Sequence, residues 1–293
     1  MKFEDIKTVS VFGAGLMGNG IAQICALQGY RVFMRDMKEE FTRSGMEAIK
    51  KSLGKAQERS IITGDQAKQA LALITPTTDM EKAAKSADIL VEAIPEKLEM
   101  KKEFYRQVDP LAPPEAIFAS NTSTLGITEL AAATGRPEKF IGMHFFNPVP
   151  LMKLVEIIRG LSTSDETVSV AEKLAVKVGK DPVIVRDAPG FITSRLGMAL
   201  YLEASKVLEA GIATPDAIDK GMRLGYGYRM GPFETCDLVG LDARLNNINA
   251  MWESTRDPFW RPPQLLRQLV TAGYLGKKPG SKGGYYTYFG VET

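Results

Sequence analysis

The sequence has few histidines and cysteines, no long apolar run and almost no net charge. One histidine and two cysteines, Cys25 and Cys236, occur in 293 residues, and the formal net charge is +2. Two distant cysteines exclude a disulfide-rich fold and fit a reducing compartment. The charge argues against nucleic acid or an anionic membrane as a partner, and no apolar run could span a bilayer. Because the N-terminal stretch also lacks the pattern of a secretory signal, we expect a cytoplasmic protein.

Strand and helix patterns alternate over the first two-thirds of the chain. Strands are expected at 8–12, 31–35, 87–94, 116–120, 139–146, 153–158 and 182–186. Helices are expected between them, at 16–28, 41–60, 97–109, 127–134 and 164–178. Such alternation is typical of a mostly parallel sheet covered by helices on both faces, so we expect an α/β domain over residues 1–187.

After residue 187 the pattern becomes helical. Helices are expected at 191–210, 215–224, 232–254 and 263–272. A strand pattern returns only at 283–289, where the sequence reads GGYYTYF. We therefore expect a second, all-helical domain over residues 188–293, joined to the first without a Ser/Gly-rich linker.

The segment GAGLMG at 13–18 matches the pattern G-x-G-x-x-G, and its context makes the match specific. A strand pattern precedes it and a helical pattern follows it, as in a dinucleotide-binding Rossmann domain. Gly13 allows the tight turn, Gly15 lets the backbone approach a pyrophosphate, and Gly18 lets helix and strand pack closely. Leu16 and Met17 complete the start of a helix whose N–H groups face the phosphates.

Asp36 is expected to select the cofactor. It ends the second strand, 18 residues after Gly18, where a carboxylate can accept hydrogen bonds from ribose hydroxyls and repels a 2′-phosphate. NAD is therefore expected, and NADP is less favoured. The neighbouring cations Arg35 and Lys38 weaken that preference.

His144, the single histidine, lies near the end of an expected strand and is followed by the proline turn NPVP. The next strand carries Glu156 between apolar neighbours, and a carboxylate in such surroundings needs a partner. Because a turn between two strands can bring residues 12 apart side by side, we expect the two side chains to pair. Glu156 would then orient His144 as a general base. The alternative is a purely structural hydrogen bond inside the sheet.

Two further patterns are weaker. SNTST at 120–124 places Asn121 and Ser123 at a strand end, where they could contact a nicotinamide or a substrate or simply form a turn. On the helix expected at 41–60, cations recur every fourth residue beside Ser52. These cations suit a polyphosphate handle or an ordinary solvated face, and they are Lys51, Lys55 and Arg59.

Together these residues resemble the 3-hydroxyacyl-CoA dehydrogenase family over nearly the whole chain. The most specific segments are GAGLMGNGIA (13–22), VEAIPEKLEMKKE (91–103), SNTST (120–124), HFFNPVPLMKLVEII (144–158), DAPGFITSR (187–195) and MGPFETCDLVGLD (230–242). The compact length is similar to that of bacterial 3-hydroxybutyryl-CoA dehydrogenases. The resemblance implies hydride transfer between NAD and C3 of an (S)-3-hydroxyacyl-CoA of short chain, as in fatty-acid and butanoate metabolism.

The resemblance also implies roles for individual side chains. His144 becomes the catalytic base and Glu156 its partner, with Ser123 and Asn147 as further active-site residues. The implied substrate contacts are Ser52, Lys55, Arg59, Ser123, Asn147 and Ser194. The implied cofactor contacts beyond the glycine turn and Asp36 are Glu96, Lys101 and Ser123. The helical domain becomes the homodimerisation unit, and no metal is expected.

Two positions depart from the family pattern. Ser194 stands where many members carry asparagine, and serine is shorter and cannot present an amide fork. Arg59 stands where a lysine is common, which keeps the cation and changes its geometry. Because of Ser194, acyl chain-length preference or turnover is expected to differ. Two other functions stay open: a dehydrogenase of a hydroxy acid without CoA, and a nucleotide-binding protein without turnover.

Overall fold

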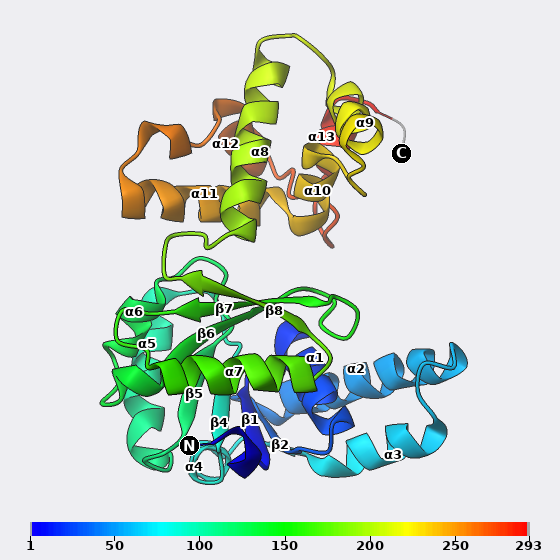
Figure 1. The fold of residues 1–293 in the computed structure, drawn as a ribbon. Coiled ribbons are helices and arrows are strands. Elements are labelled where there is room, and N and C mark those ends of the chain that lie inside the picture. The colour runs from blue at the N-terminus through cyan, green and yellow to red at the C-terminus, as the bar shows by residue number, and fades with distance from the viewer. Residues whose placement is uncertain (1, 292–293) are drawn as a thin grey trace. The chain divides into compact units, whose positions relative to one another are not determined.

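The computed structural model describes residues 2–291, which divide into two compact units between Phe191 and Ile192 (Figure 1). The first unit contains a sheet and its covering helices, and the second is helical. Within residues 2–291, no helix is both long enough and apolar enough to cross a membrane.

The sheet of the first unit has eight strands in the order β3-β2-β1-β4-β5-β6-β7-β8. The strands are β1 (Thr8–Phe12), β2 (Arg31–Arg35), β3 (Ile74–Thr77), β4 (Ile89–Glu92), β5 (Ile117–Ser120), β6 (Phe140–Phe145), β7 (Leu154–Arg159) and β8 (Asp181–Arg186). All neighbouring pairs are parallel except β6 and β7, which are antiparallel. The expected mostly parallel sheet is confirmed. Because β1, β4, β5 and β6 run in one direction, their carboxyl ends meet at one edge.

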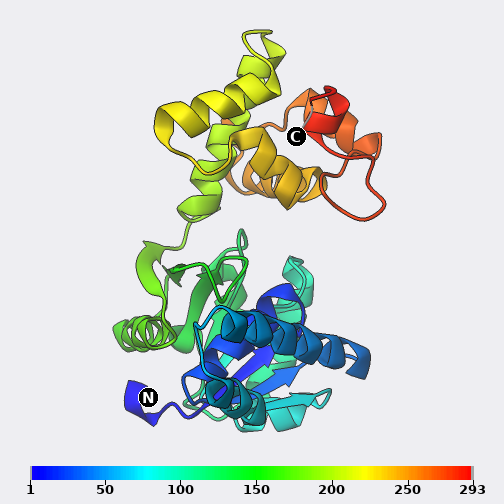
Figure 2. The ribbon, with the colours of Figure 1, turned by 90° about the vertical axis from the view of Figure 1, so that its right-hand side faces the viewer.

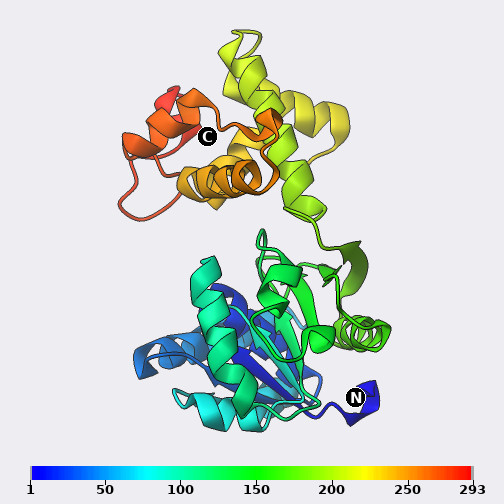
Figure 3. The same cartoon turned by 90° about the vertical axis from the view of Figure 1, so that its left-hand side faces the viewer.

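Helices cover both faces of this sheet. The α-helices of the first unit are α1 (Leu16–Leu27), α2 (Glu39–Glu58), α3 (Gly64–Leu73), α4 (Met80–Lys85), α5 (Leu98–Val108), α6 (Ile127–Ala131) and α7 (Asp165–Lys177). Side chains of α1, α2, α3 and α7 form one apolar core with the sheet, and α4, α5 and α6 form a second core on the other face. Figure 2 shows the side of α1 and α2, and Figure 3 the side of α5 and α6. Strands buried on both faces read as continuous apolar runs, which made them recognisable.

The segment between α2 and β4 contains three elements that the sequence did not predict. They are α3, β3 and α4. The strand β3 has only four residues, and Pro76 lies inside it. A proline is tolerated there because β3 is the edge strand of the sheet, paired only with β2. Neither its length nor its composition marks it as a strand.

The second unit corrects two predictions. Its helices are α8 (Thr193–Glu209), α9 (Pro215–Tyr226), α10 (Pro232–Val239), α11 (Leu241–Thr255), α12 (Gln264–Thr271) and α13 (Tyr285–Tyr288). The single helix expected at 232–254 is two helices, because Gly240 adopts a φ of 105° between them.

The strand expected at 283–289 is wrong, because this segment contains the short helix α13. The Asp237 carboxylate accepts hydrogen bonds from the backbone N–H groups of Tyr285 and Tyr286 at 2.7 and 3.2 Å. These bonds satisfy donors at the start of the helix. The Tyr285 ring packs on Phe233 with ring centroids 4.7 Å apart. Long-range contacts therefore override the local β-propensity of the tyrosines.

Candidate active site

The glycine turn between β1 and α1 has the geometry that its sequence predicts. Gly13 has a φ of 105°, and a Cβ added to it would lie 2.4 Å from the Ala93 carbonyl oxygen. A Cβ on Gly18 would lie 1.7 Å from the Gly13 oxygen, so strand and helix can approach only with glycine there. A Cβ on Gly15, by contrast, would meet no atom within 4 Å. The backbone at Gly15 is therefore accessible to a ligand.

The start of α1 fits a dinucleotide. The first intrahelical hydrogen bond runs from the Asn19 N–H to the Gly15 oxygen at 3.0 Å. The N–H groups of Leu16, Met17 and Gly18 precede it and have no acceptor in the helix, which makes the helix start a site for phosphate oxygens. Leu16 is exposed and Met17 is half-buried. These residues would hold the pyrophosphate of NAD.

Asp36 lies beside this turn and is fixed to it. Its Oδ2 accepts a hydrogen bond from the Ala14 N–H at 2.7 Å, and its Oδ1 accepts one from the Met37 N–H at the same distance. A carboxylate oxygen can accept more than one hydrogen bond. Asp36 can therefore hold the glycine turn and still receive ribose hydroxyls.

His144 and Glu156 face each other across the antiparallel strands β6 and β7. They are partners in the strand register, and His144 Nδ1 lies 2.7 Å from Glu156 Oε2. The histidine is 7% exposed and the glutamate is fully buried. The pairing expected from the sequence is thus present, and it leaves Nε2 as the imidazole nitrogen that can exchange a proton with a substrate.

Two aromatic rings lie beside the histidine, and an amide holds the strand that carries it. Phe146 and Phe191 lie against the imidazole with ring centroids 4.5 and 5.9 Å away. From the end of β5, Asn121 Oδ1 accepts a hydrogen bond from the Phe145 N–H at 2.8 Å. Asn147 is exposed at the start of the connection to β7. Asn121 therefore ties the strand that carries the histidine to the neighbouring strand end.

Glu96 organises the SNTST loop. Its Oε1 accepts hydrogen bonds from the Thr122 hydroxyl at 2.5 Å and from the N–H groups of Ser123 and Thr124 at 2.8 and 3.1 Å. Partial burial alone would raise the pKa of Glu96, but the Lys101 ammonium and these hydrogen bonds lower it below its usual value. Glu96 is thus an anion at neutral pH that holds Ser123 at the strand edge.

Comparison with known proteins agrees with this geometry. Residues 8–188 match the family model of the 3-hydroxyacyl-CoA dehydrogenase NAD binding domain, and residues 190–288 match that of its C-terminal domain. The chain belongs to the 3-hydroxyacyl-CoA dehydrogenase family. It is accordingly an NAD-dependent oxidoreductase of the Rossmann type, as the resemblance implied.

Three relatives illustrate the match. A probable 3-hydroxybutyryl-CoA dehydrogenase of Deinococcus radiodurans is 45% identical over 95% of this chain and 99% of its own length. The human mitochondrial hydroxyacyl-coenzyme A dehydrogenase is 40% identical over 97% of this chain and 91% of its own. The crystal structure of (S)-3-hydroxybutyryl-CoA dehydrogenase from Ralstonia eutropha superimposes with a TM-score of 0.91 at 42% identity, covering 96% of this chain and 99% of that one.

One charged residue of this dehydrogenase was missed by sequence reasoning. Glu92, at the end of β4, is fully buried, and its Oε1 accepts hydrogen bonds from Lys101 Nζ at 2.7 Å and the Ile94 N–H at 2.8 Å. Its Oε2 accepts hydrogen bonds from the Ser120 and Tyr105 hydroxyls at 2.7 and 3.2 Å. The available signal was an acid that ends the apolar run ILV (89–91), since a buried charge needs a partner.

Lys101 connects this buried acid to the loop above it. Its ammonium lies 2.7 Å from Glu92 Oε1 and 3.1 Å from Glu96 Oε2, and the side chain is 1% exposed. Burial would lower the pKa of Lys101, but the charges of Glu92 and Glu96 outweigh it and raise that pKa. The chain of contacts Glu92, Lys101, Glu96 therefore supports the loop that carries Ser123.

The other substrate residues implied by the family lie on α2 and α8. Ser52 is half-buried on α2, while Lys51, Lys55 and Arg59 are exposed, Arg59 being the residue that caps the helix C-terminus. Ser194 lies half-buried in the first turn of α8, in the second unit.

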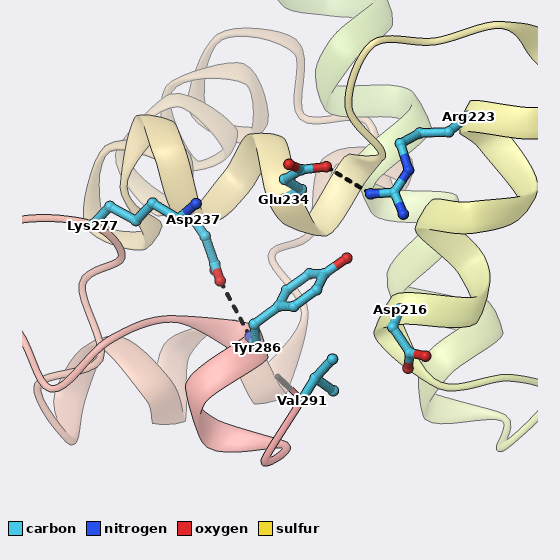
Figure 4. Close-up of a pocket in the computed structure, with 7 residues that line it drawn as sticks. All are labelled: Asp216, Arg223, Glu234, Asp237, Lys277, Tyr286 and Val291. Carbon is cyan, nitrogen blue, oxygen red and sulfur yellow. Dashed lines mark hydrogen bonds and ion pairs between the residues drawn. The ribbon is translucent and has the colours of Figure 1, made fainter. Parts of the chain in front are cut away.

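The second unit also contains a cavity of about 300 Å³, which none of the predicted site residues lines (Figure 4). Its walls contain acidic and basic side chains, and several of these have partners. Arg223 lies 2.9 Å from Glu234, and Asp237 accepts hydrogen bonds from backbone N–H groups of α13. The residues drawn are Asp216, Arg223, Glu234, Asp237, Lys277, Tyr286 and Val291. The His144–Glu156 pair and the glycine turn lie in the first unit.

Proposed function

We propose that this enzyme interconverts (S)-3-hydroxybutyryl-CoA and acetoacetyl-CoA with NAD. The observation that carries the proposal is the buried pair of His144 and Glu156, 2.7 Å apart. His144 lies on β6, and β5 and β4 connect β6 within the sheet to β1, the strand that ends at the glycine turn. A histidine whose Nδ1 is held by a carboxylate has its Nε2 free to act as an acid or a base.

The proton step belongs to His144. In the oxidative direction Nε2 accepts the proton of the C3 hydroxyl, and in the reductive direction the imidazolium returns it to the C3 carbonyl oxygen. The bound nicotinamide supplies the acceptor or donor of the hydride at C3. Glu156 stabilises the imidazolium, since a buried carboxylate favours a neighbouring positive charge.

The remaining side chains would hold the substrate and the cofactor. Ser123 and Asn147 would contact the reacting end of the thioester, Ser194 the acyl chain, and Glu96 the nicotinamide ribose. The buried Lys101 would serve the cofactor site by holding Glu96 in place. Cations on a helix are well suited to the phosphates of CoA. The CoA handle would thus be bound by Ser52, Lys55 and Arg59.

A spectrophotometric assay tests the function directly. Purified enzyme should oxidise NADH at 340 nm when acetoacetyl-CoA is added, and it should be much slower with free acetoacetate. Comparable rates with acetoacetate would instead identify a dehydrogenase of a hydroxy acid without CoA. Loss of signal with every keto substrate, while NADH still binds, would identify a nucleotide-binding protein without turnover.

Cofactor selectivity provides a second prediction. We expect kcat/KM with NADH to exceed that with NADPH by roughly fivefold or more, because the Asp36 carboxylate repels a 2′-phosphate. Asp36→Asn should narrow this ratio, since the amide removes the charge and keeps an oxygen that can accept the Ala14 N–H. The control is Asp65→Asn, an exposed acid in the first turn of α3. Preference of the unmutated enzyme for NADPH would contradict the assignment.

The proposal includes a homodimer formed through the helical unit. Leu224 and Tyr226 on α9 are 77% and 76% exposed, and Leu238 on α10 is 53% exposed. Large apolar side chains that are exposed on neighbouring helices are available for a protein interface. We expect a dimer by light scattering and a monomer after Leu224→Asp, whereas Lys220→Asp on the same helix serves as a control for the added charge. A monomeric unmutated protein would contradict the proposal.

We also propose a cytoplasmic location. Cys25 and Cys236 are both buried free thiols, and burial raises the pKa of each to about 12. Such thiols are inert packing residues that need no oxidising compartment.

A further inference from the structure

Lys180 is a buried lysine whose ammonium group binds the connection between β6 and β7, the strands of His144 and Glu156. It is 7% exposed, and its ammonium donates hydrogen bonds to the carbonyl oxygens of Val149 and of Met152, the latter at 2.8 Å. Both carbonyls belong to the segment that joins β6, with His144, to β7, with Glu156. Burial, and then the charge of Lys153, lower the pKa of Lys180. Burying a charged group costs free energy, so a buried lysine with two carbonyl partners indicates a specific structural role.

The end of α7 places this lysine under the connection. Gly179 has a φ of 79°, its N–H donates to the Val176 oxygen, and the Lys180 N–H donates to the Ala175 oxygen at 2.9 Å. This is the Schellman arrangement that ends a helix and fixes the direction of the next residue. The following N–H, of Asp181, donates to the Lys153 oxygen at 2.8 Å. The connection is thus anchored at its middle by Lys180, in the turn before β8, and at its end by Asp181, the first residue of β8.

A second anchor lies on the cofactor helix. Val149 is 2% exposed and packs where α1 has Gly20. A Cβ added to Gly20 would lie 2.7 Å from Val149 Cβ, closer than such atoms approach, so the connection rests directly on the helix backbone. The helix that begins at the glycine turn therefore touches the segment that carries Asn147.

We propose that Lys180 and Gly20 are positioning residues of this dehydrogenase. They clamp the 146–153 connection against α1, so that Asn147 and the His144–Glu156 pair keep their place relative to a cofactor bound at the start of the same helix. Neither residue touches the reacting atoms. This inference rests on the proposed function, because its kinetic test uses acetoacetyl-CoA.

The first test removes the ammonium with Lys180→Met. Because displacing a reactive group by about 1 Å can cost up to roughly 100-fold in rate, we expect kcat to fall roughly 10- to 100-fold. The dissociation constant of NADH should stay within about twofold, since the glycine turn is untouched. The primary isotope effect with deuterated NADH should increase, which loss of folded enzyme alone would not cause. Lys180→Gln, which keeps N–H donors, should recover part of kcat.

The control for this substitution is Lys177→Met, an exposed lysine at the end of α7. Trypsin reports on the clamp independently of activity: cleavage after the exposed Lys153 should be faster in Lys180→Met than in the unmutated protein or the control. An unchanged kcat, isotope effect and cleavage rate would overturn the inference. If the unmutated protein does not reduce acetoacetyl-CoA, the proposed function fails, and the cleavage rates still decide whether the clamp exists.

The second test changes Gly20, the anchor on α1, and leaves every charged group in place. Gly20→Ala should lower kcat because the new methyl displaces Val149. Gly20→Ala with Val149→Gly should regain most of it, because glycine removes the Cβ of residue 149 that the new methyl would meet. Gly54→Ala on α2, where an added Cβ meets no atom within 4 Å, is the control for a glycine-to-alanine change in a helix. Full activity of Gly20→Ala, or failure of the second substitution to restore it, would overturn the coupling to α1.

Discussion

Replacing His144 with glutamine should lower kcat for acetoacetyl-CoA reduction by roughly 10³- to 10⁴-fold, the upper range of what a general acid–base residue contributes. Glutamine fills a similar space and can still form a hydrogen bond with Glu156. It cannot take up and release a proton near neutral pH. The loss should therefore affect the chemical step and spare both the fold and the glycine turn 13–18.

The measurement separates these effects. Steady-state rates at saturating NADH give kcat, protein fluorescence quenching gives the dissociation constant of NADH, and thermal unfolding reports on stability. We expect only kcat to change strongly, while NADH affinity stays within about twofold, since ligand contacts at the helix start are unchanged. A variant with activity near that of the unmutated enzyme would show that the His144–Glu156 bond is structural.

The parts of the fold that could be predicted are those with a local signature. The turn at 13–18 combines glycines whose added Cβ atoms would clash, as at Gly13 and Gly18, with a strand before and a helix after it. The position of Glu156 opposite His144 followed from the proline turn NPVP and from an acid placed between apolar residues of the next strand. Both features depend on residues close in sequence, so their geometry can be worked out without the rest of the chain.

The parts that could not be predicted depend on distant contacts. The Glu92 carboxylate is satisfied by Lys101, Tyr105 and Ser120, which reach it from α5 and β5, 9 to 28 residues away. Helix α13 forms at a segment with strand propensity because Asp237, 48 residues earlier, binds its first N–H groups. Such contacts exist only once the elements have packed, and no local pattern encodes them.

Glu156→Gln should lower kcat for oxidation of (S)-3-hydroxybutyryl-CoA by roughly 10²- to 10³-fold, less than the loss of the histidine itself. The substitution removes the charge that stabilises the imidazolium, and its amide can donate a hydrogen bond to Nδ1, which favours the tautomer with the proton on Nε2. That tautomer cannot accept a proton from a substrate hydroxyl. Because Glu156 is fully buried beside the imidazole, solvent cannot substitute for the lost charge. Glu253→Gln, at an exposed position of α11, controls for the chemical change.

The double variant decides whether the two residues act as a unit. If Glu156 works only through the imidazole, then adding Glu156→Gln to His144→Gln should reduce kcat by less than about threefold more, because residues of one catalytic unit are strongly non-additive. Multiplication of the two single effects would instead mean that Glu156 supports the site by a separate route, such as the packing of β7 on β6. The strand register, which places the two residues directly opposite each other, leads us to expect the first result.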